Sequence, residues 1–470
     1  MLPYLPGGNG LSSLKKCILT VLFIFFLAFM NAKPCIAREI PVELVWNFKD
    51  AGWLGVSIEA GNYRLIVVNE KTGGKLTVPT KETACTSGSS FECGWGGFAP
   101  IFRLEDKPFE IWRGAEIELR TLDSNGVFKV QTPDGKAVRY RGSLLLSWKG
   151  DHWSLINLID QEEYLKGVVP IEMSNAWAQD GLEALKAQAV AARTYLVKKL
   201  QTASQITDYP DYDQAYLGKE VEGQASKAIA ATKGEILVDN QTRLPIDALY
   251  SSHNGGFTEK AENVWSNRDP HFSSHPDPFS MGMGGAADQW RFIISADELG
   301  KTFQLDPIQE IQLDKYPSGR VKKVRMTDLK GKSKEIPGRT FVQAFYPFGH
   351  PIHSEAFLGS LFEVQKVPGQ AETRGPYMPG QPSQWKLLIE PQLINRDAAI
   401  HSGPRLDRVL SSSLGVREFP SSEGIFIFWG RGWGHGVGMS QWGAYHMAQL
   451  GYSYREILNY YYDNTDLAQQ

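Results

Sequence analysis

The sequence has few of the features that mark several large functional classes. Its 470 residues include only four cysteines, and 49 basic against 52 acidic residues give a formal net charge of −3. This balance provides neither a basic surface for nucleic acid nor a long acidic segment. No Cys-x-x-Cys or His-Glu-x-x-His spacing is present, so we predict no metal, no cofactor and no nucleic-acid partner. At about 150 residues per domain, the length suggests two or three packed domains.

The first 37 residues have the pattern of an export signal. Lys15 and Lys16 precede an apolar stretch from Cys17 to Met30, and small residues before Arg38 suit cleavage. The stretch is shorter than the roughly 20 residues of a membrane-spanning helix, although an uncleaved anchor would show similar chemistry. We predict an exported protein of the periplasm, cell wall or extracellular space, with membrane anchoring as the alternative.

Cleavage of this signal would leave two cysteines. Cys85 and Cys93 are the ends of the Gly/Ser-rich string CTSGSSFEC. An oxidising compartment favours a disulfide that closes this short loop, and two free thiols are the alternative.

The pattern along the chain predicts an α+β protein with a β-rich N-terminal region. Over residues 38–147, short β-prone runs such as Tyr63–Val68 alternate with Gly, Asp and Pro clusters. Residues 148–465 predict a mixed sheet domain with a long helix from Leu182, where apolar residues recur at helical spacing. A Gly/Trp-rich loop and helices follow near the C-terminus, after a Pro/Gly-rich insertion around residues 368–423.

The first candidate site segment contains an acid and two cations. Glu172 lies between Pro170 and the predicted helix, where a turn can present its carboxylate, although a solvated turn glutamate is the simpler interpretation. Lys186 and Arg193 lie two turns apart on one side of that helix. They either line a groove or cover the rim of the core with their long stems.

Two further segments carry unusual strings. In DALYSSHNGGFTEKAENVW, Ser252 and His253 stand at the end of a predicted strand, but no Gly-x-Ser-x-Gly turn or acid partner supports a nucleophilic triad. In FWGRGWGHGVGMSQWGA, glycines alternate with tryptophans, Arg431 and His435, in a spacing that fits no phosphate loop. Tryptophan rings with polar handles suit sugars, and a buried core turn is the alternative.

Together, YLKGVVPIEM, EALKAQAVAARTY, SSHNGGFTEKAENVW and GRGWGHGVGMSQWGA resemble the family of stage II sporulation protein D and the amidase enhancer LytB. The resemblance covers residues from about Trp148 to Thr465. It implies a lytic transglycosylase that cleaves peptidoglycan glycan strands stripped of stem peptides, with Glu172 as the general acid/base. The substrate-binding residues that it implies are Lys186, Arg193, Tyr195, Ser252, His253, Thr258, Arg431, Trp433, His435 and Gln441.

The sequence departs from the family pattern in two places. A few extra residues separate Glu172 from the following helix, so the turn that presents the acid is expected to differ in shape. Some members carry a Cys/His zinc cluster, but the corresponding string here, ITDYPDYDQAYLG, contains neither residue type. The zinc site is therefore not carried over to this chain.

Acid/base chemistry with one carboxyl group explains the predicted reaction. Protonated Glu172 would donate to the glycosidic oxygen, and its carboxylate would then remove a proton from the attacking muramyl 6-hydroxyl. A nearby cation would favour the carboxylate, so Lys186 and Arg193 are assigned to substrate orientation. Hydrolysis would need a second acid, such as Glu259 or Glu262. The other alternative is a wall-binding protein or amidase activator, with a cell-wall amidase as partner.

Overall fold

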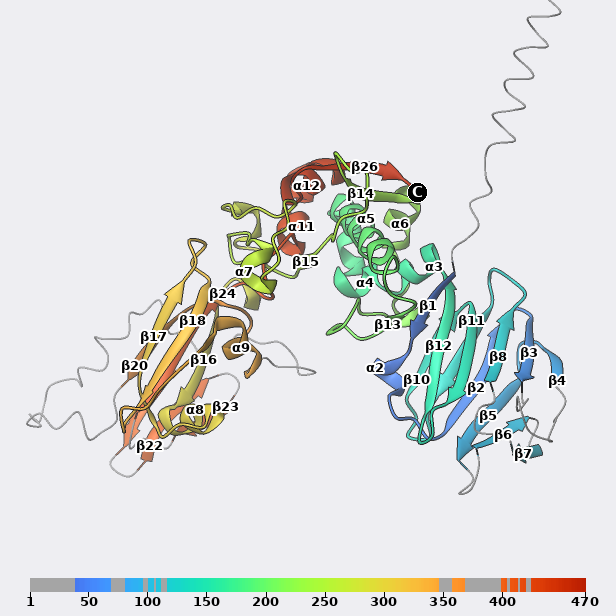
Figure 1. Ribbon diagram of the computed structural model, residues 1–470, viewed down its shortest axis with the longest axis horizontal. Coiled ribbons are helices and arrows are strands. Elements are labelled where there is room, and N and C mark those ends of the chain that lie inside the picture. Colours follow the sequence, from blue (N-terminus) through green and yellow to red (C-terminus); the bar gives the residue numbers. More distant parts are fainter. Residues whose placement is uncertain are drawn as a thin grey trace, which may run out of the picture.

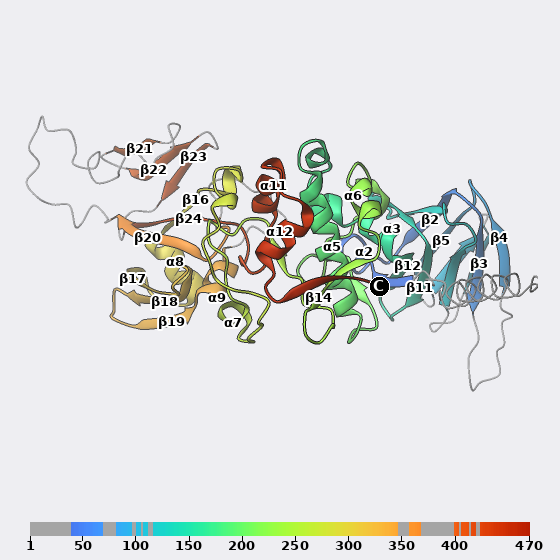
Figure 2. The same cartoon turned by 90° about the horizontal axis from the view of Figure 1, so that it is seen from above.

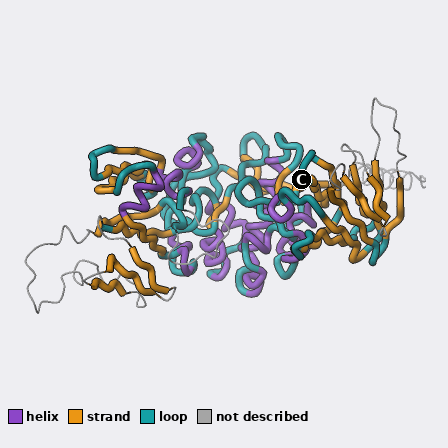
Figure 3. The backbone as a smooth tube through the Cα atoms, turned by 90° about the horizontal axis from the view of Figure 1, so that it is seen from below, coloured by secondary structure: helices purple, strands orange, loops and turns teal. Residues whose placement is uncertain are grey.

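The computed structural model describes residues 39–68, 81–95, 100–104, 107–110, 116–345, 357–367, 399–403, 406–412, 415–419 and 424–470. The predicted signal peptide and residues 368–398 of the predicted insertion lie outside this part of the chain. A β-sandwich, a helical lobe and a second β lobe stand in a row (Figures 1 and 2). Helices gather in the middle of the molecule and strands at both ends (Figure 3).

The N-terminal sandwich consists of a seven-stranded sheet, β13-β1-β12-β11-β8-β3-β4, and a six-stranded sheet, β10-β9-β2-β5-β6-β7. Buried and exposed residues alternate along strands such as β1 and β10, as expected for sheets with one face in a core. The strands are β1 (Glu39–Glu43), β2 (Leu54–Ala60), β3 (Tyr63–Val68), β4 (Lys81–Cys85), β5 (Ser90–Trp95), β6 (Pro100–Leu104), β7 (Lys107–Glu110), β8 (Glu116–Thr121), β9 (Val127–Gln131), β10 (Ala137–Arg141), β11 (Ser143–Trp148), β12 (Trp153–Asp160) and β13 (Ile206–Thr207). A one-turn helix, α2 (Val45–Phe48), follows β1.

The helical lobe is built around α5 (Leu182–Lys199), which is buried on most of its surface. Alanine is its most frequent residue, and these small side chains let neighbouring elements approach closely on several sides. The surrounding elements are α3 (Gln161–Lys166), α4 (Val169–Glu172), α6 (Ser226–Ala231), α11 (Gln441–Gln449), α12 (Tyr454–Tyr461) and the antiparallel pair β14 (Glu235–Asp239) and β26 (Thr465–Gln469). The 3₁₀ segments η1 (Asn175–Gln179) and η2 (Gly218–Val221) connect them. One hydrophobic core runs from the sandwich into this lobe.

The second β lobe is inserted between two parts of the helical lobe. One sheet has the order β16-β24-β20 and another β17-β18-β19, and they enclose a core rich in phenylalanine. The elements are β16 (Trp290–Ser295), α8 (Ala296–Phe303), β17 (Ile308–Lys315), β18 (Val321–Asp328), β19 (Ser333–Pro337), α9 (Gly338–Gln343), β20 (Leu361–Val367) and β24 (Ile425–Arg431). A separate sheet contains β21 (Ala399–Gly403), β22 (Leu406–Ser412) and β23 (Gly415–Phe419).

A short parallel pairing joins the segments before and after this insertion. Strand β15 (Tyr250–Ser251) pairs with β25 (Met439–Ser440), so chain segments almost 190 residues apart lie side by side. Between β15 and β16 lie α7 (Ala261–Trp265), η3 (Pro278–Ser280) and η4 (Gly285–Ala287). The predicted α+β class is confirmed. Among the described residues, no helix combines the length and apolar character needed to cross a membrane.

The predicted disulfide between Cys85 and Cys93 does not form in the structure, which holds both residues as buried thiols. Cys85 pairs with Tyr63 in the seven-stranded sheet, whereas Cys93 pairs with Leu54 in the six-stranded sheet. The string between them thus passes from one sheet to the other and is not a loop closed on itself. Burial raises the pKa of the Cys93 thiol above its usual range, which suppresses the reactive thiolate.

We expect both thiols to resist alkylation in the native protein and to react fully after unfolding without any reductant, because burial blocks access. Peptide mass spectrometry of the Cys85 and Cys93 peptides measures the labelling. If alkylation of the unfolded protein needed a prior reductant, a disulfide would be present and the assignment of two thiols would be wrong.

Candidate functional site

Glu172 is the last residue of the one-turn helix α4, and its side chain is half-buried. Pro170 lies in the first turn of this helix, where its missing N–H costs no hydrogen bond. The backbone becomes extended at Met173, and η1 then leads into α5. The extra residues before α5 thus form a short 3₁₀ turn.

The carboxyl group of Glu172 is held by groups from three separate segments. The Gln441 Nε2 atom donates to Glu172 Oε2 at 3.0 Å from the start of α11. The Tyr250 hydroxyl, on β15, and the backbone N–H of Ala215 also form hydrogen bonds with the carboxyl group. The side chain therefore points into the protein toward these groups.

Burial is the dominant influence on the titration of Glu172, and it raises the pKa of the carboxyl group. The hydrogen bonds from Gln441, Tyr250 and Ala215 act in the opposite direction with smaller effect. The phenols of Tyr164 and Tyr195 are close enough for the Glu172 charge to raise their pKa, after the larger effect of their own burial. A desolvated carboxyl that keeps its proton at higher pH is suited to general acid catalysis.

Aromatic side chains lie next to the residues that hold Glu172. Trp177, on η1, stacks on Tyr445 with ring centroids 4.2 Å apart and meets Trp442 edge-on at 4.8 Å. Trp442 directly follows Gln441, and its backbone N–H donates to the Ser252 carbonyl at 3.1 Å. The same turn of α11 thus carries a polar contact to the acid and a half-buried aromatic ring.

The loop of residues 208–217 contributes to the site although it contains no recognisable motif. The Gln214 Nε2 atom donates to the Tyr250 hydroxyl at 3.0 Å and to the Ala192 carbonyl at 3.2 Å. Asp213 pairs with Lys199 at 2.9 Å and lies 3.5 Å from the hydroxyl of the predicted site residue Tyr195. The sequence-based prediction of site residues included neither this loop nor Tyr250, although Tyr250 stands in the DALYSSHNGG string.

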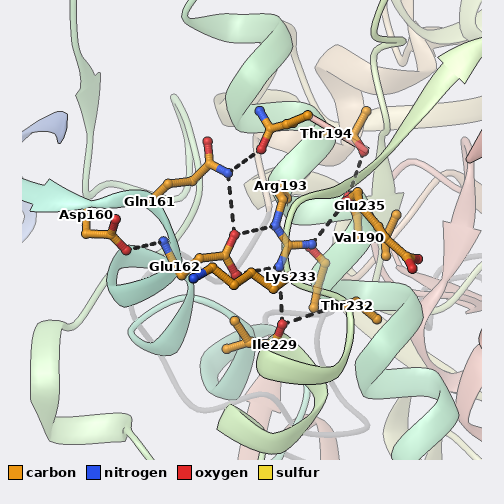
Figure 4. A network of polar contacts seen from close by, with 12 residues as sticks. Asp160, Gln161, Glu162, Val190, Arg193, Thr194, Ile229, Thr232, Lys233 and Glu235 are labelled. Carbon is orange, nitrogen blue, oxygen red and sulfur yellow. Dashed lines mark hydrogen bonds and ion pairs between the residues drawn. The ribbon is translucent and has the colours of Figure 1, made fainter. Parts of the chain in front are cut away.

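Arg193 has a structural role in place of the predicted substrate contact. Its side chain is fully buried, and Nε and Nη2 each donate to one carboxylate oxygen of Glu162 at 2.8 Å. The remaining donors reach the carbonyls of Ala189, Glu235 and Ile229 (Figure 4). This network ties α5 to α3, α6 and β14, and it leaves the guanidinium no exposed surface for a ligand.

Lys186 also has partners outside the Glu172 site. Its ammonium group forms an ion pair with Glu183 one turn earlier and lies 5.8 Å from the ring centroid of Tyr454, on α12. Neither cation makes an ion pair with Glu172. Their charges are balanced locally, so they do not oppose the protonation of the acid.

The predicted site residues of the SSHNGGFTEKAENVW string form hydrogen bonds that stabilise the chain around β15. His253 is buried, with Nε2 2.9 Å from Asp288 and Nδ1 accepting from the Gly255 N–H. The Thr258 hydroxyl is bonded to the backbone of the segment 273–275. Ser252 is half-buried, and its carbonyl receives the N–H of Trp442. Of these residues, Ser252 lies nearest in the chain to the Tyr250 contact with Glu172.

The Gly/Trp string reaches the acid through Gln441. Arg431 is exposed at the end of β24, and Trp433 pairs through its backbone with His253 and packs against the core of the second β lobe. The His435 ring lies edge-on to Trp265 at 4.8 Å, and burial lowers the pKa of His435 to about 3. This histidine is therefore neutral near pH 7 and is a poor general acid.

Glu259 and Glu262, the acids proposed for hydrolysis, are not among the groups that form hydrogen bonds with Glu172. Glu259 is buried and bonded to Ser318 and Asn263, with Arg320 3.9 Å away. No carboxylate is among the described groups that form hydrogen bonds with Glu172.

The residues at the position where some family members carry a zinc cluster do not fit a metal, because Asp208 binds backbone N–H groups and Asp213 pairs with Lys199. Within the described ranges, no group of three or more His, Cys, Asp or Glu could hold a metal ion.

Comparisons with known proteins match the central part of the chain. Residues 149–238 match the family model described as stage II sporulation protein. Over 307 residues the chain is 30% identical to the amidase enhancer of Bacillus subtilis (strain 168), an alignment that covers 64% of this chain but only 40% of that protein. It is 25% identical over 334 residues to stage II sporulation protein D of Bacillus amyloliquefaciens, covering 66% of this chain and 75% of that protein. An uncharacterized protein of Brachyspira hyodysenteriae is 28% identical over 355 residues, covering 73% and 77% of the two chains.

The buried ion pair of Arg193 can be tested by substitution. We expect Arg193→Met to lower the free energy of unfolding by about 3–5 kcal/mol, because Glu162 would be left without its partner in a largely buried position. The matched control is Arg455→Met, since Arg455 pairs with Glu235 at the surface, where a loss of about 1 kcal/mol or less is expected. Denaturant unfolding measures both. Equal losses in the two variants would contradict a structural role for Arg193.

The raised pKa of Glu172 predicts a pH-dependent difference in stability. The folded state binds the proton more tightly than the unfolded chain, so wild-type stability falls as pH rises from the unfolded to the folded pKa. We therefore expect Glu172→Gln to be more stable than wild type above that range and to lose the advantage in acid. Denaturant unfolding from about pH 4 to about pH 8 checks this.

Glu456 provides a control for this measurement, because its pKa is shifted in the opposite direction to that of Glu172. Hydrogen bonds from Ser453 lower the pKa of Glu456, so its contribution to stability is present above the unfolded pKa and is lost as pH falls through the folded pKa. Glu456→Gln should therefore lose stability at neutral pH relative to wild type. A Glu172→Gln variant that behaved in the same way would show that the pKa of Glu172 is not raised.

Proposed function

Because the chain belongs to the family of stage II sporulation protein D and the amidase enhancer, we propose that it is an exported lytic transglycosylase of the cell wall. Its substrate would be peptidoglycan glycan strands free of stem peptides. The main support is the Glu172 carboxyl group, which is half-buried, raised in pKa and bonded to Gln441, Tyr250 and Ala215. A single desolvated acid of this kind suits a reaction that needs one proton donor and acceptor.

In the first step of the proposed reaction, protonated Glu172 donates its proton to the glycosidic oxygen that links muramic acid to glucosamine. The bond between that oxygen and the muramyl anomeric carbon breaks, and the glucosamine end leaves as an alcohol. The charge that develops on Glu172 is stabilised by the amide of Gln441 and the hydroxyl of Tyr250.

Gln214 orients the Tyr250 hydroxyl for this task. Its Nε2–H group donates to the Tyr250 oxygen, which leaves the phenolic proton available for Glu172. Burial raises the pKa of Tyr250 well above its usual value, so the phenol keeps that proton. Tyr250 thus acts as a hydrogen-bond donor to the carboxylate.

In the second step, the Glu172 carboxylate removes the proton from the muramyl 6-hydroxyl as that oxygen attacks the anomeric carbon. A 1,6-anhydromuramyl end forms, the acid is regenerated, and no water is consumed. This reaction needs only one acid, whereas hydrolysis normally uses a second carboxyl group to activate water or to act as nucleophile. The rings of Trp177 and Trp442 offer apolar faces beside the acid for sugar binding.

The alternative function is to enhance a cell-wall amidase by holding glycan without cleaving it. One observation favours it: a relative with 30% identity is named as an amidase enhancer. The chain spans 40% of that relative, so a partner amidase is a proposal for this protein.

Amidase-treated glycan strands provide the direct test. Purified protein should produce anhydromuramyl ends, detected by mass spectrometry, and Glu172→Gln should lower the rate by about 10²–10⁴-fold while retaining binding. Glu456→Gln, in the capping box at the start of α12, is the matched control and should keep wild-type activity, because Glu456 does not contact Glu172 or the residues that hold it.

Other products would overturn the proposal. Reducing ends in place of anhydromuramyl ends would show hydrolysis. Glycan binding and amidase stimulation without any cleavage product, equal in wild type and Glu172→Gln, would establish the alternative function.

A further inference from the structure

A cluster of three aromatic rings lies where the N-terminal sandwich meets the helical lobe. The rings of Trp46, on α2, and Tyr209 meet edge-on with centroids 6.5 Å apart, and Tyr209 is 5.5 Å from Tyr212. Trp46 and Tyr209 are half-buried, whereas Tyr212 is 68% exposed. Among the large hydrophobic side chains of the described residues, Tyr212 is the most exposed, so its ring is accessible to a ligand.

The cluster is fixed by a buried carboxylate. Asp208 Oδ1 accepts the backbone N–H groups of Val45 at 2.8 Å and Trp46 at 2.7 Å, and Asp208 itself is fully buried. These bonds attach the start of α2 to the segment that carries Tyr209 and Tyr212. The backbone at Trp46 is therefore fixed against the segment that carries the two tyrosines before any ligand binds, which lowers the entropic cost of binding.

The same segment leads directly to the acid. Tyr212 is three residues before Ala215, whose backbone N–H is bonded to Glu172. Three residues span at most about 10 Å, so the aromatic cluster lies within reach of a polymer bound at Glu172. Tyr209, Tyr212 and the Glu172 contact thus belong to one loop, while Trp46 comes from the sandwich.

We propose that Trp46, Tyr209 and Tyr212 form a distal saccharide subsite for the glycan strand on which Glu172 acts. The proposal rests on the proposed function and extends it, because it assigns the N-terminal sandwich a part in substrate binding. Aromatic faces bind the C–H faces of neutral sugar rings, and the Asp211 carboxylate, hydrogen-bonded to Tyr209, is an acceptor for sugar hydroxyls.

The size of the cluster favours a saccharide over a protein partner. Three aromatic side chains offer at most about 150–250 Å² each, and two of these three are already half-buried. A stable protein interface needs roughly 800 Å² from each partner. A polymer that is already bound at Glu172 needs only a small additional contact at this distance.

Binding as a function of chain length tests the subsite. In a Glu172→Gln background, which prevents cleavage, calorimetry measures the affinity for peptide-free glycan oligosaccharides of increasing length. Affinity should rise once the oligosaccharides are long enough to reach the cluster. Adding Tyr212→Ala should weaken binding of the long oligosaccharides about tenfold and leave the short ones unchanged.

Three further variants separate ring contact from loss of structure. Tyr212→Phe keeps the ring and should retain most of the affinity, and Trp46→Ala should reproduce the loss seen for long oligosaccharides. Tyr452→Ala removes an exposed tyrosine after α11 and should have no effect at any length. Short oligosaccharides also report folding, because they bind only at the Glu172 site.

Two results would overturn the subsite, and they can be told apart. If long oligosaccharides bind the Tyr212→Ala and Trp46→Ala variants as tightly as the parent, the cluster does not bind glycan, while the proposal for Glu172 stands. If no oligosaccharide of any length binds the parent or wild type, the proposed function and the subsite both fail.

Discussion

The site depends on a parallel strand pairing that is only two residues long. Tyr250 pairs with Met439 and Ser251 with Ser440, and Trp442 extends the contact by donating to the carbonyl of Ser252. This pairing places the Tyr250 phenol and the Gln441 amide around one carboxyl group. A buried polar network supports it, because the Ser440 hydroxyl accepts the Gly443 N–H and is bonded to Ser280, which in turn donates to buried Asp277.

The charges of the helical lobe are arranged so that neither Lys186 nor Arg193 pairs with the acid. Arg193 is neutralised by Glu162, and Lys186 by Glu183, on α5 and its surroundings. A guanidinium in contact with Glu172 would have lowered the pKa of its carboxyl group and favoured the anion. Burial can therefore dominate the titration of Glu172, which is the property that general acid catalysis requires.

The sequence predicted those features that depend on local pattern. The α+β class and the long helix from Leu182 both follow from the periodicity of apolar residues along the chain. Features that depend on long-range packing were not predictable: the loop carrying Ala215 has no motif, and Tyr250 reaches the acid only through strand pairing. The predicted disulfide was wrong because the short spacing between Cys85 and Cys93 does not reveal that they belong to different sheets. Arg193 was misassigned because helical spacing does not show what covers a helix face.

The insertion of the second β lobe has a consequence for the order in which the site assembles. Glu172 and Tyr250 are synthesised early, but Gln441 follows about 190 residues after Tyr250, beyond the entire inserted lobe. Until that last segment emerges from the ribosome and docks beside α5, the carboxyl group lacks its amide partner, and α5 lacks the cover of α11 and α12. In a nascent chain the hydrogen-bond network around Glu172 is therefore incomplete until the segment that carries Gln441 has been made and has folded.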